Sequence, residues 1–367
     1  ADLLSVELSG YNDNLIVESG GLVVPENLDV IDNFDRKRYT ELYGYESEFD
    51  NFLTARHYFK GTAAHNTVYV NKKDQATFED NFRWLGIGNL KALETYHIVA
   101  DELDHYSAAL ENQDYAHRRA MYYVKPQIEN RRADDYWFFL DKVAVHGRAG
   151  VNRVEQIWHI SPSQQLRDVD RERARIGTDN MVVAQARLKN AAPLQTEIVD
   201  TYNLTDFLRI DAKAIKFAYD QSAAADFLFA TAIIPSAAGE IVAHVHLDEL
   251  EINDFNRFAE QPGARAFRLR FSRTSARGQE RGVEDHIFIS NTPNGLYSWS
   301  PGRRGTDSVM TNKRFELHRR IDGEHAKTIL VDWDGTPYFD VETLAGEYAL
   351  ALPHATALGQ NYPNPFN

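Results

Sequence analysis

The sequence predicts an all-β protein, a large antiparallel β-sandwich with few short helices. Its apolar runs are short and are bounded by Gly, Asn, Asp or Pro, as strands between turns are. Aromatic residues make up 12% of the chain, with 18 Tyr and 20 Phe. Several segments alternate with a period of two; in 154–160 most apolar side chains fall on one side. No internal repeat or heptad is present.

The same signals place the individual elements. Strands are expected at 15–17, 67–70, 96–100, 120–124, 136–140, 154–160, 182–186, 267–271, 286–290 and 328–331. Two segments, 77–85 and 250–260, are the best helix candidates, although both are short and only weakly amphipathic. Many strands with intervening turns and so few helices are typical of a sandwich.

Domain boundaries are gradual. Residues 1–235 read as one continuous β-domain, and the Pro-Ser-Ala-Ala-Gly stretch at 235–239 is the best internal break. Residues 236–352 are again rich in strands and are interpreted either as a continuation of the sandwich or as a small C-terminal β-domain. Residues 353–367 shift to Pro, Ala, Gly and Asn, which indicates a linker.

Composition excludes several classes of function. The 367 residues contain 40 Lys and Arg against 54 Asp and Glu, a net charge of -14. This balance argues against nucleic-acid or anionic-membrane binding, although a local basic groove can coexist with it. The absence of Cys excludes disulfides, Cys-ligated metals and thiol nucleophiles. No apolar run approaches eighteen residues, so no transmembrane helix is predicted.

The richest chemistry lies in residues 56–71. His65 and Asn66 enter a β-branched strand after a stretch of small residues, and Arg56, Tyr58 and Lys60 lie just upstream. A His at a strand entrance can ligate a metal through one ring nitrogen while a neighbour fixes the other. The alternative is a capped strand whose His is simply hydrogen-bonded, which is the commoner situation for a single His.

Six segments together resemble one known family. They are the Ala-Ala-His-Asn-Thr-Val run at 63–68, the opening segments 1–5 and 15–20, and the stretches 115–119, 137–141 and 154–159. The run at 63–68 is similar to a signature of the heparinase II/III-like polysaccharide lyases. The resemblance covers most of residues 1–340 and is strongest over 1–160.

This resemblance implies a metal, usually zinc, held within the β-sandwich. Residue by residue it assigns Glu18 and His65 as ligands, although the family more often has Asp at the first position. The third ligand, a His of a His-x-His motif, is expected immediately upstream of Ala1. The resemblance also implies an upstream helical toroid, expected to be missing from this chain, that carries most catalytic groups.

The implied reaction is β-elimination on a uronic-acid-containing glycan, such as alginate, heparan sulfate or a related uronate. A base removes the C5 proton and the glycosidic oxygen leaves from C4, while the neighbouring carboxylate is neutralised. In this chain Tyr58 and Arg56 are the catalytic candidates, and His57 and Lys60 the substrate-binding candidates. Without the toroid, the fragment is expected to be inactive.

Other polar groups are weaker candidates. Arg36, Lys37 and Arg38 form a second basic cluster, and Tyr43 and Tyr45 are possible cleft phenols; solvated surface positions are the alternative for each. His244, His246 and Asp248 alternate along one strand face, which is feasible for a metal. Because this trio lies far from the family position, solvent-facing strand histidines are the preferred interpretation.

The last ten residues, 358–367, resemble the start of the C-terminal sorting domain of the type IX secretion system. The string Asn-Tyr-Pro-Asn-Pro-Phe-Asn at 361–367 is the specific part, and a plain Pro-rich linker is the alternative. The resemblance implies secretion or display at the cell surface through the outer membrane, with the periplasm as second choice. Two functions without catalysis also stay open: a carbohydrate-binding sandwich and a structural or adhesive exported module.

Overall fold

The computed structural model describes the chain in segments. They are residues 4–11, 13–18, 58, 61–75, 77–78, 84–85, 91–99, 103–112, 114–126, 134–146, 150–166, 168–170, 175–178, 180–189, 192–205, 208–222, 227–255, 263–292, 295–301, 308–332 and 337–340. Strands dominate these segments, and every ladder between them is antiparallel. The all-β fold expected from the short alternating runs is therefore confirmed.

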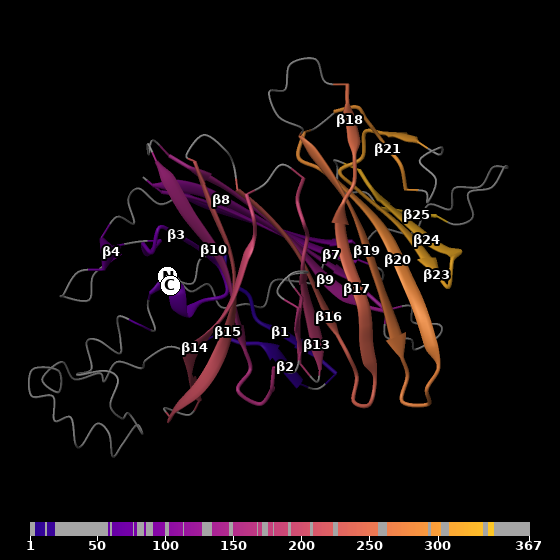
Figure 1. Ribbon diagram of the computed structural model, residues 1–367. Coiled ribbons are helices and arrows are strands. Elements are labelled where there is room, and N and C mark those ends of the chain that lie inside the picture. Colours follow the sequence, from indigo (N-terminus) through magenta and orange to yellow (C-terminus); the bar gives the residue numbers. More distant parts are fainter. Residues whose placement is uncertain are drawn as a thin grey trace, which may run out of the picture.

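Three large sheets carry the fold (Figure 1). The first sheet has the order β1 (Leu8–Gly10), β2 (Asp13–Ile16), β10 (Val151–Ile160), β15 (Leu208–Ser222) and β14 (Gln195–Thr205), with β3 (Val68–Val70) also paired to β10. The central sheet has the order β11 (Asp168–Asp170), β12 (Arg175–Gly177), β13 (Met181–Gln185), β16 (Phe227–Pro235), β9 (Tyr136–Val145), β8 (Tyr115–Val124), β7 (Leu103–Glu111) and β6 (Lys91–Val99). The C-terminal sheet has the order β17 (Ile241–Glu249), β19 (Ala264–Thr274), β20 (Glu280–Ser290), β23 (Phe315–Ile321), β24 (Glu324–Val331) and β25 (Pro337–Asp340).

The central sheet is buried on both faces. Strand β9 shows why: Phe139 and Val143 pack with Trp158 of the first sheet, whereas Phe138 on the other face packs with Phe267 of the C-terminal sheet. A strand covered on both sides reads as a continuous apolar run, which accounts for the unbroken Tyr-Trp-Phe-Phe-Leu at 136–140. The described segments thus form a three-layered stack of sheets, with one large hydrophobic core on each side of the central sheet (Figure 1).

Buried ion pairs join the central and C-terminal sheets as well. Arg319 of β23 is fully buried and contacts Asp285 of β20 at 2.7 Å and Asp134, beside β9, at 3.0 Å. The Tyr136 hydroxyl of β9 donates to Asp285 at 2.6 Å. These contacts and the shared apolar core connect the C-terminal sheet to the central sheet.

Smaller elements complete the fold and correct the two helix predictions. The 77–85 segment contains paired strands β4 (Thr77–Phe78) and β5 (Trp84–Leu85), and 250–260 contains β18 (Ile252–Asp254). β18 pairs with β21 (Tyr297–Trp299), which pairs with β22 (Val309–Thr311), so tertiary pairing overrode a weak helical pattern. Within the described segments, the longest helical element is the 3₁₀ turn η1 (Thr62–Ala64), and none is long and apolar enough to span a membrane.

Candidate metal centre

His65 is placed by a short turn that is hydrogen-bonded to the loop after β3. The turn η1 precedes it, and the Thr62 backbone N–H donates to Asp74 at 2.6 Å while the Thr62 hydroxyl accepts from the Gln75 N–H at 2.7 Å. The chain becomes extended at His65 and continues into β3. The small residues of 61–64 allow this tight turn, and the β-branched residues that follow enter the sheet.

Glu18 and His65 are brought into direct contact, although 47 positions separate them in the sequence. The Glu18 carboxylate Oε2 meets His65 Nδ1, and the Ser5 hydroxyl donates to the other oxygen, Oε1. The His65 side chain is 4% exposed and that of Glu18 is 20% exposed. The two residues singled out from the family resemblance therefore form one partly buried pair.

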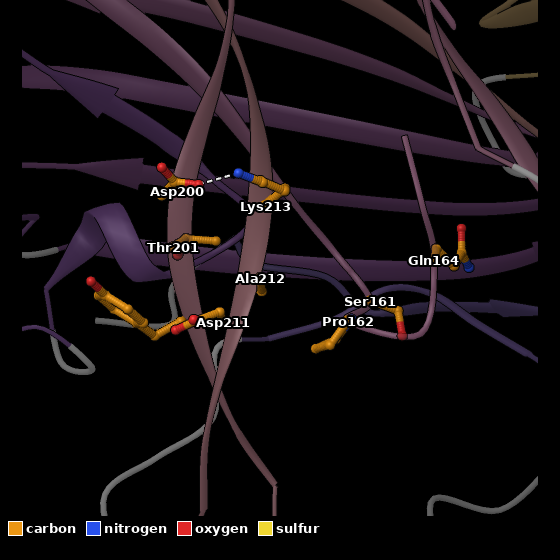
Figure 2. Close-up of a pocket in the computed structure, with 9 residues that line it drawn as sticks. Ser161, Pro162, Gln164, Asp200, Thr201, Asp211, Ala212 and Lys213 are labelled. Atoms are coloured by element: carbon orange, nitrogen blue, oxygen red, sulfur yellow. Dashed lines mark hydrogen bonds and ion pairs between the residues drawn. The ribbon is translucent and has the colours of Figure 1, made fainter. Parts of the chain in front are cut away.

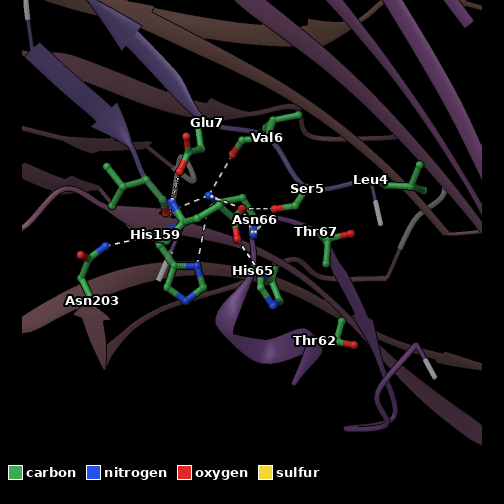
Figure 3. A network of polar contacts seen from close by, with 12 residues as sticks. Leu4, Ser5, Val6, Glu7, Thr62, His65, Asn66, Thr67, His159 and Asn203 are labelled. Atoms are coloured by element: carbon green, nitrogen blue, oxygen red, sulfur yellow. Dashed lines mark hydrogen bonds and ion pairs between the residues drawn. The ribbon is translucent and has the colours of Figure 1, made fainter. Parts of the chain in front are cut away.

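The Asn66 side chain forms hydrogen bonds with the chain segments around this pair (Figure 3). Its side-chain amide donates to the Val6 and Val17 carbonyls, both at 2.9 Å, and to Glu18 Oε1 at 3.2 Å. Its side-chain oxygen accepts from the His159 backbone N–H at 2.6 Å. One fully buried side chain thus connects the segments around β1, β2 and β10.

The electrostatics of the pair favour an ionised carboxylate. Burial by itself would raise the pKa of Glu18, but the hydrogen bond and charge of His65 and the Ser5 hydroxyl outweigh burial, so the pKa lies below its usual range. Burial lowers the pKa of the neighbouring His159 to about 4, against a smaller opposing effect of Glu18. At neutral pH an anionic oxygen and an imidazole nitrogen therefore stand side by side.

A second buried polar network lies directly beneath the pair. Arg119 of β8 is bound by both oxygens of Asp141 on β9, at 2.7 and 3.0 Å, and all of these atoms are buried. His117 and Gln156 also contact Asp141, each at 2.7 Å. Burial alone would raise the pKa of Asp141, but the Arg119 charge and the His117 contact hold it well below its usual range.

The Glu18–His65 pair supplies donor atoms that zinc accepts. A carboxylate oxygen and an imidazole nitrogen are both zinc ligands, and their convergence in a partly buried site suits that ion. No third His, Asp or Glu completes a ligand cluster within the segments that the structure describes. The pair therefore fits zinc as two of the three protein ligands that the resemblance implies.

Tyr58 lies beside strand β14. Its hydroxyl contacts the Thr201 hydroxyl and accepts from the Tyr202 backbone N–H at 3.3 Å, and its ring meets Tyr202 edge-on at 5.6 Å. The next residue of β14, Asn203, donates its amide to the Glu18 carbonyl at 2.6 Å. Tyr58 and Glu18 thus form hydrogen bonds with adjacent residues of β14, Tyr202 and Asn203.

Arg56, His57 and Lys60, as well as 36–38, Tyr43 and Tyr45, lie outside the described residues.

An open pocket of about 440 Å³ lies on the β14–β15 ribbon (Figure 2). Its lining comprises Ser161, Pro162, Gln164, Asp200, Thr201, Tyr202, Asp211, Ala212 and Lys213. Asp200 and Lys213 form an exposed ion pair across its rim. Because its lining holds two carboxylates and one ammonium group, the pocket has no net positive charge that would attract a uronate.

The histidines of β17 do not form a metal site. His244 has a left-handed backbone (φ 51°), and the pairing register shifts between Ala243 and His246. The Asp248 carboxylate accepts from Arg268 at 3.1 Å and Arg270 at 3.5 Å, so two guanidinium groups already neutralise it. The preferred interpretation, solvent-facing strand histidines, agrees with the exposed position of His244.

The residues that organise the site were not predicted from the sequence. Asn66, Arg119 and Asp141 lie in the segments that carry the family resemblance, yet nothing identified them as supports of the site. The available signal was a charged residue inside an otherwise apolar strand, as at Asp141 after Phe138 and Leu140. Such charges, once buried, need partners.

The chain was compared with solved structures and with known protein families. Solved structures similar to this chain include the heparan sulfate lyase HepC from Pedobacter heparinus (TM-score 0.48, 13% identity, covering 77% of this chain and 36% of that one). Another is a heparinase III (TM-score 0.44, 15% identity, covering 77% of this chain and 35% of that one). The chain thus spans about a third of the length of these proteins.

No curated protein sequence matches the chain. Residues 1–247, which include the Glu18–His65 pair, match the family described as heparinase II/III-like, C-terminal. The chain therefore belongs to the heparinase II/III-like C-terminal family.

Proposed function

We propose that this chain is the β-sandwich part of an exported polysaccharide lyase that cleaves uronic-acid-containing glycans by β-elimination. The family match over residues 1–247, which contains the paired Glu18 and His65, is the observation that carries the proposal. Heparan sulfate lyase activity is ascribed to the HepC neighbour, and a glycosaminoglycan is the corresponding substrate class here. Alginate and related uronates suit the same chemistry.

Glu18 and His65 would hold a structural zinc ion, together with a ligand from outside the described residues. When bound, zinc supplies a cross-link between the chain segments of its ligands. Ser5 and Asn66 orient the Glu18 carboxylate, and this carboxylate in turn contacts the His65 ring.

The reaction breaks the C5–H bond of a uronate, whose electron pair forms the C4=C5 double bond. The C4–O bond breaks with its electrons on the glycosidic oxygen, which takes up a proton. Neutralising the C6 carboxylate makes the C5 proton more acidic, and a group of tuned pKa transfers it. Arg56, His57, Tyr58 and Lys60 are proposed to line the cleft, and the residues that complete catalysis are proposed to lie in an upstream helical toroid.

Zinc analysis tests the metal assignment. In the full-length protein we expect one zinc ion per chain and its loss in His65→Ala. His286→Ala removes an equally buried His from β20 of the C-terminal sheet and is the matched control, which should keep the metal. Absence of zinc from the parent protein, or its retention in His65→Ala, would disprove the assignment.

Product analysis tests the reaction. Elimination creates an unsaturated sugar end that absorbs in the ultraviolet, which neither hydrolysis nor binding produces. We expect this signal when the full-length protein meets alginate, heparan sulfate or hyaluronan, and none from residues 1–367 alone. A protein that retains these glycans on a column without cleaving them would instead be a carbohydrate-binding module.

Export is proposed from residues 358–367, which lie outside the described residues. Secretion or surface display through the outer membrane follows from their resemblance to a type IX sorting segment. Fractionation of the native bacterium should find the protein outside the cell or on its surface. Recovery from the periplasm would support the second choice, and recovery from the cytoplasm would contradict export.

A further inference from the structure

Arg119 joins two chain segments that lie beside the candidate ligands. Its Nη1 donates to the Leu4 carbonyl at 2.6 Å and to the Asn66 carbonyl at 2.5 Å. Leu4 precedes Ser5, whose hydroxyl contacts Glu18, and Asn66 directly follows His65. A single guanidinium nitrogen therefore links the supports of the two ligands.

The guanidinium itself has no freedom to move. Asp141 holds two of its nitrogens, and Asp141 is fixed in turn by His117 and Gln156. The group lies over the rings of Phe139 at 5.6 Å and Trp158 at 5.1 Å, and its side chain is fully buried. Its position is thus set by β8, β9 and β10, the stable interior of the sandwich, rather than by the site.

The Leu4 backbone shows that the surroundings impose its position. Leu4 is buried and has a left-handed conformation (φ 64°), which is unfavourable for a non-glycine residue. Such a conformation persists only where neighbouring contacts determine it. The hydrogen bond from Arg119 to the Leu4 carbonyl is one of those contacts.

We propose that Arg119 is a positioning residue that sets the separation of Glu18 and His65 and so tunes the affinity of the site for zinc. The inference rests on the proposed function for the identity of the metal, but not for the geometry. A purely structural arginine would stabilise the fold without any specific effect on the pair.

Arg319 provides the matched control. It is also fully buried, is held by both oxygens of Asp285, and lies over the Tyr136 ring at 5.7 Å. Its contacts join the central and C-terminal sheets instead of the site. Substitutions at the two arginines should therefore cost similar stability, and only one of them should affect the site.

The experiment compares Arg119→Lys, Arg119→Met, Arg319→Lys and Arg319→Met in the full-length protein. Chelator competition measures zinc affinity, thermal unfolding measures stability, and hydrogen–deuterium exchange reports on residues 4–18 and 61–71. Loss of a support around ligands typically costs 10–100-fold in metal affinity, and we expect a loss in this range for both Arg119 variants. Arg119→Lys should recover stability relative to Arg119→Met, because it retains a charge beside Asp141, but should not recover affinity, because an ammonium lacks the planar fork.

Exchange in 4–18 and 61–71 should rise in the Arg119 variants and stay unchanged in the Arg319 variants. Equal changes in affinity or exchange at the two arginines would overturn the proposal. If the parent protein contained no zinc, the metal assignment would be disproved. The exchange measurement would still test whether Arg119 positions the two segments.

Discussion

Asp141 illustrates what a single buried charge does in this molecule. It is fully buried on β9 and balances the Arg119 guanidinium, so its removal leaves an uncompensated charge in the core. We expect Asp141→Asn to lower the free energy of unfolding by about 3–5 kcal/mol, as loss of one partner of a buried pair does. Urea titration measures the change.

Asp220→Asn is the control for this prediction. Asp220 pairs with Arg153 at the partly exposed edge of β15, where an ion pair contributes only about 0–1 kcal/mol. A loss at Asp141 no larger than at Asp220 would contradict the role of Asp141 as an obligatory partner of Arg119.

The lowered pKa of His286 makes the free energy of unfolding depend on pH. Burial lowers its pKa to about 4 from the ordinary 6.5, with Glu284 opposing and Arg268 reinforcing the change. The groups around it are Arg268 on β19, Glu284 and Asp285 on β20, and His318 and Arg320 on β23. As pH falls below about 6.5 the unfolded chain takes up the proton first, so stability is lost between pH 6.5 and 4 and is fully present above 6.5.

His286→Gln should therefore reduce the fall in unfolding free energy between pH 7 and pH 5. The difference from the parent is limited to about 1.4 kcal/mol per pH unit, the value for one proton. Urea titrations at the two pH values measure it. Identical falls in both proteins would show that His286 titrates equally in the folded and unfolded chains.

At the scale of elements, strand β9 is central because both of its faces are buried. Phe138 lies in the core shared with the C-terminal sheet and Phe139 in the core shared with the first sheet. Either residue changed to Ala should cost about 3–5 kcal/mol of stability, which thermal or urea unfolding measures. Val151→Ala, at a position that is 73% exposed, should change stability by less than about 1 kcal/mol.

The stabilities of the Phe138→Ala and Phe139→Ala variants distinguish a stack of three sheets from a two-layered sandwich. If the C-terminal sheet did not pack on β9 in solution, Phe138→Ala would be nearly neutral while Phe139→Ala would remain costly. Similar losses at both positions are the expected result.

At the scale of the whole molecule, the C-terminal sheet covers an apolar face that could not remain in water. Tyr122, Phe138, Ala232 and Ile234 of the central sheet are buried in that core. A chain shortened to end at Pro235 should therefore aggregate or bind a hydrophobic dye, as large exposed apolar patches do. A soluble, cooperatively unfolding 1–235 chain would instead favour two independent domains.

Local sequence pattern was sufficient for the class of fold. The alternation of apolar and polar residues and the short bounded runs correctly predicted strands such as β10 and β19. Side chains alternate between the two faces of any strand, because this alternation follows from the backbone geometry. The same reasoning failed at Thr77 and Ile252, where a weak local preference was overridden by pairing with a distant strand. The order of strands in the sheets could not be read from the pattern at all.

The sequence by itself determined the all-β class, the lack of cysteine chemistry and, through the family resemblance, the choice of Glu18 and His65. Only the tertiary structure decided that these two side chains meet, that Asn66 connects three strands around them, and that Arg119 holds their supports from below. The physical reason is that a hydrogen bond between segments 50 or 100 residues apart leaves no local trace. Buried charges such as Arg119 and Asp141 acquire a role only once folding removes the water around them.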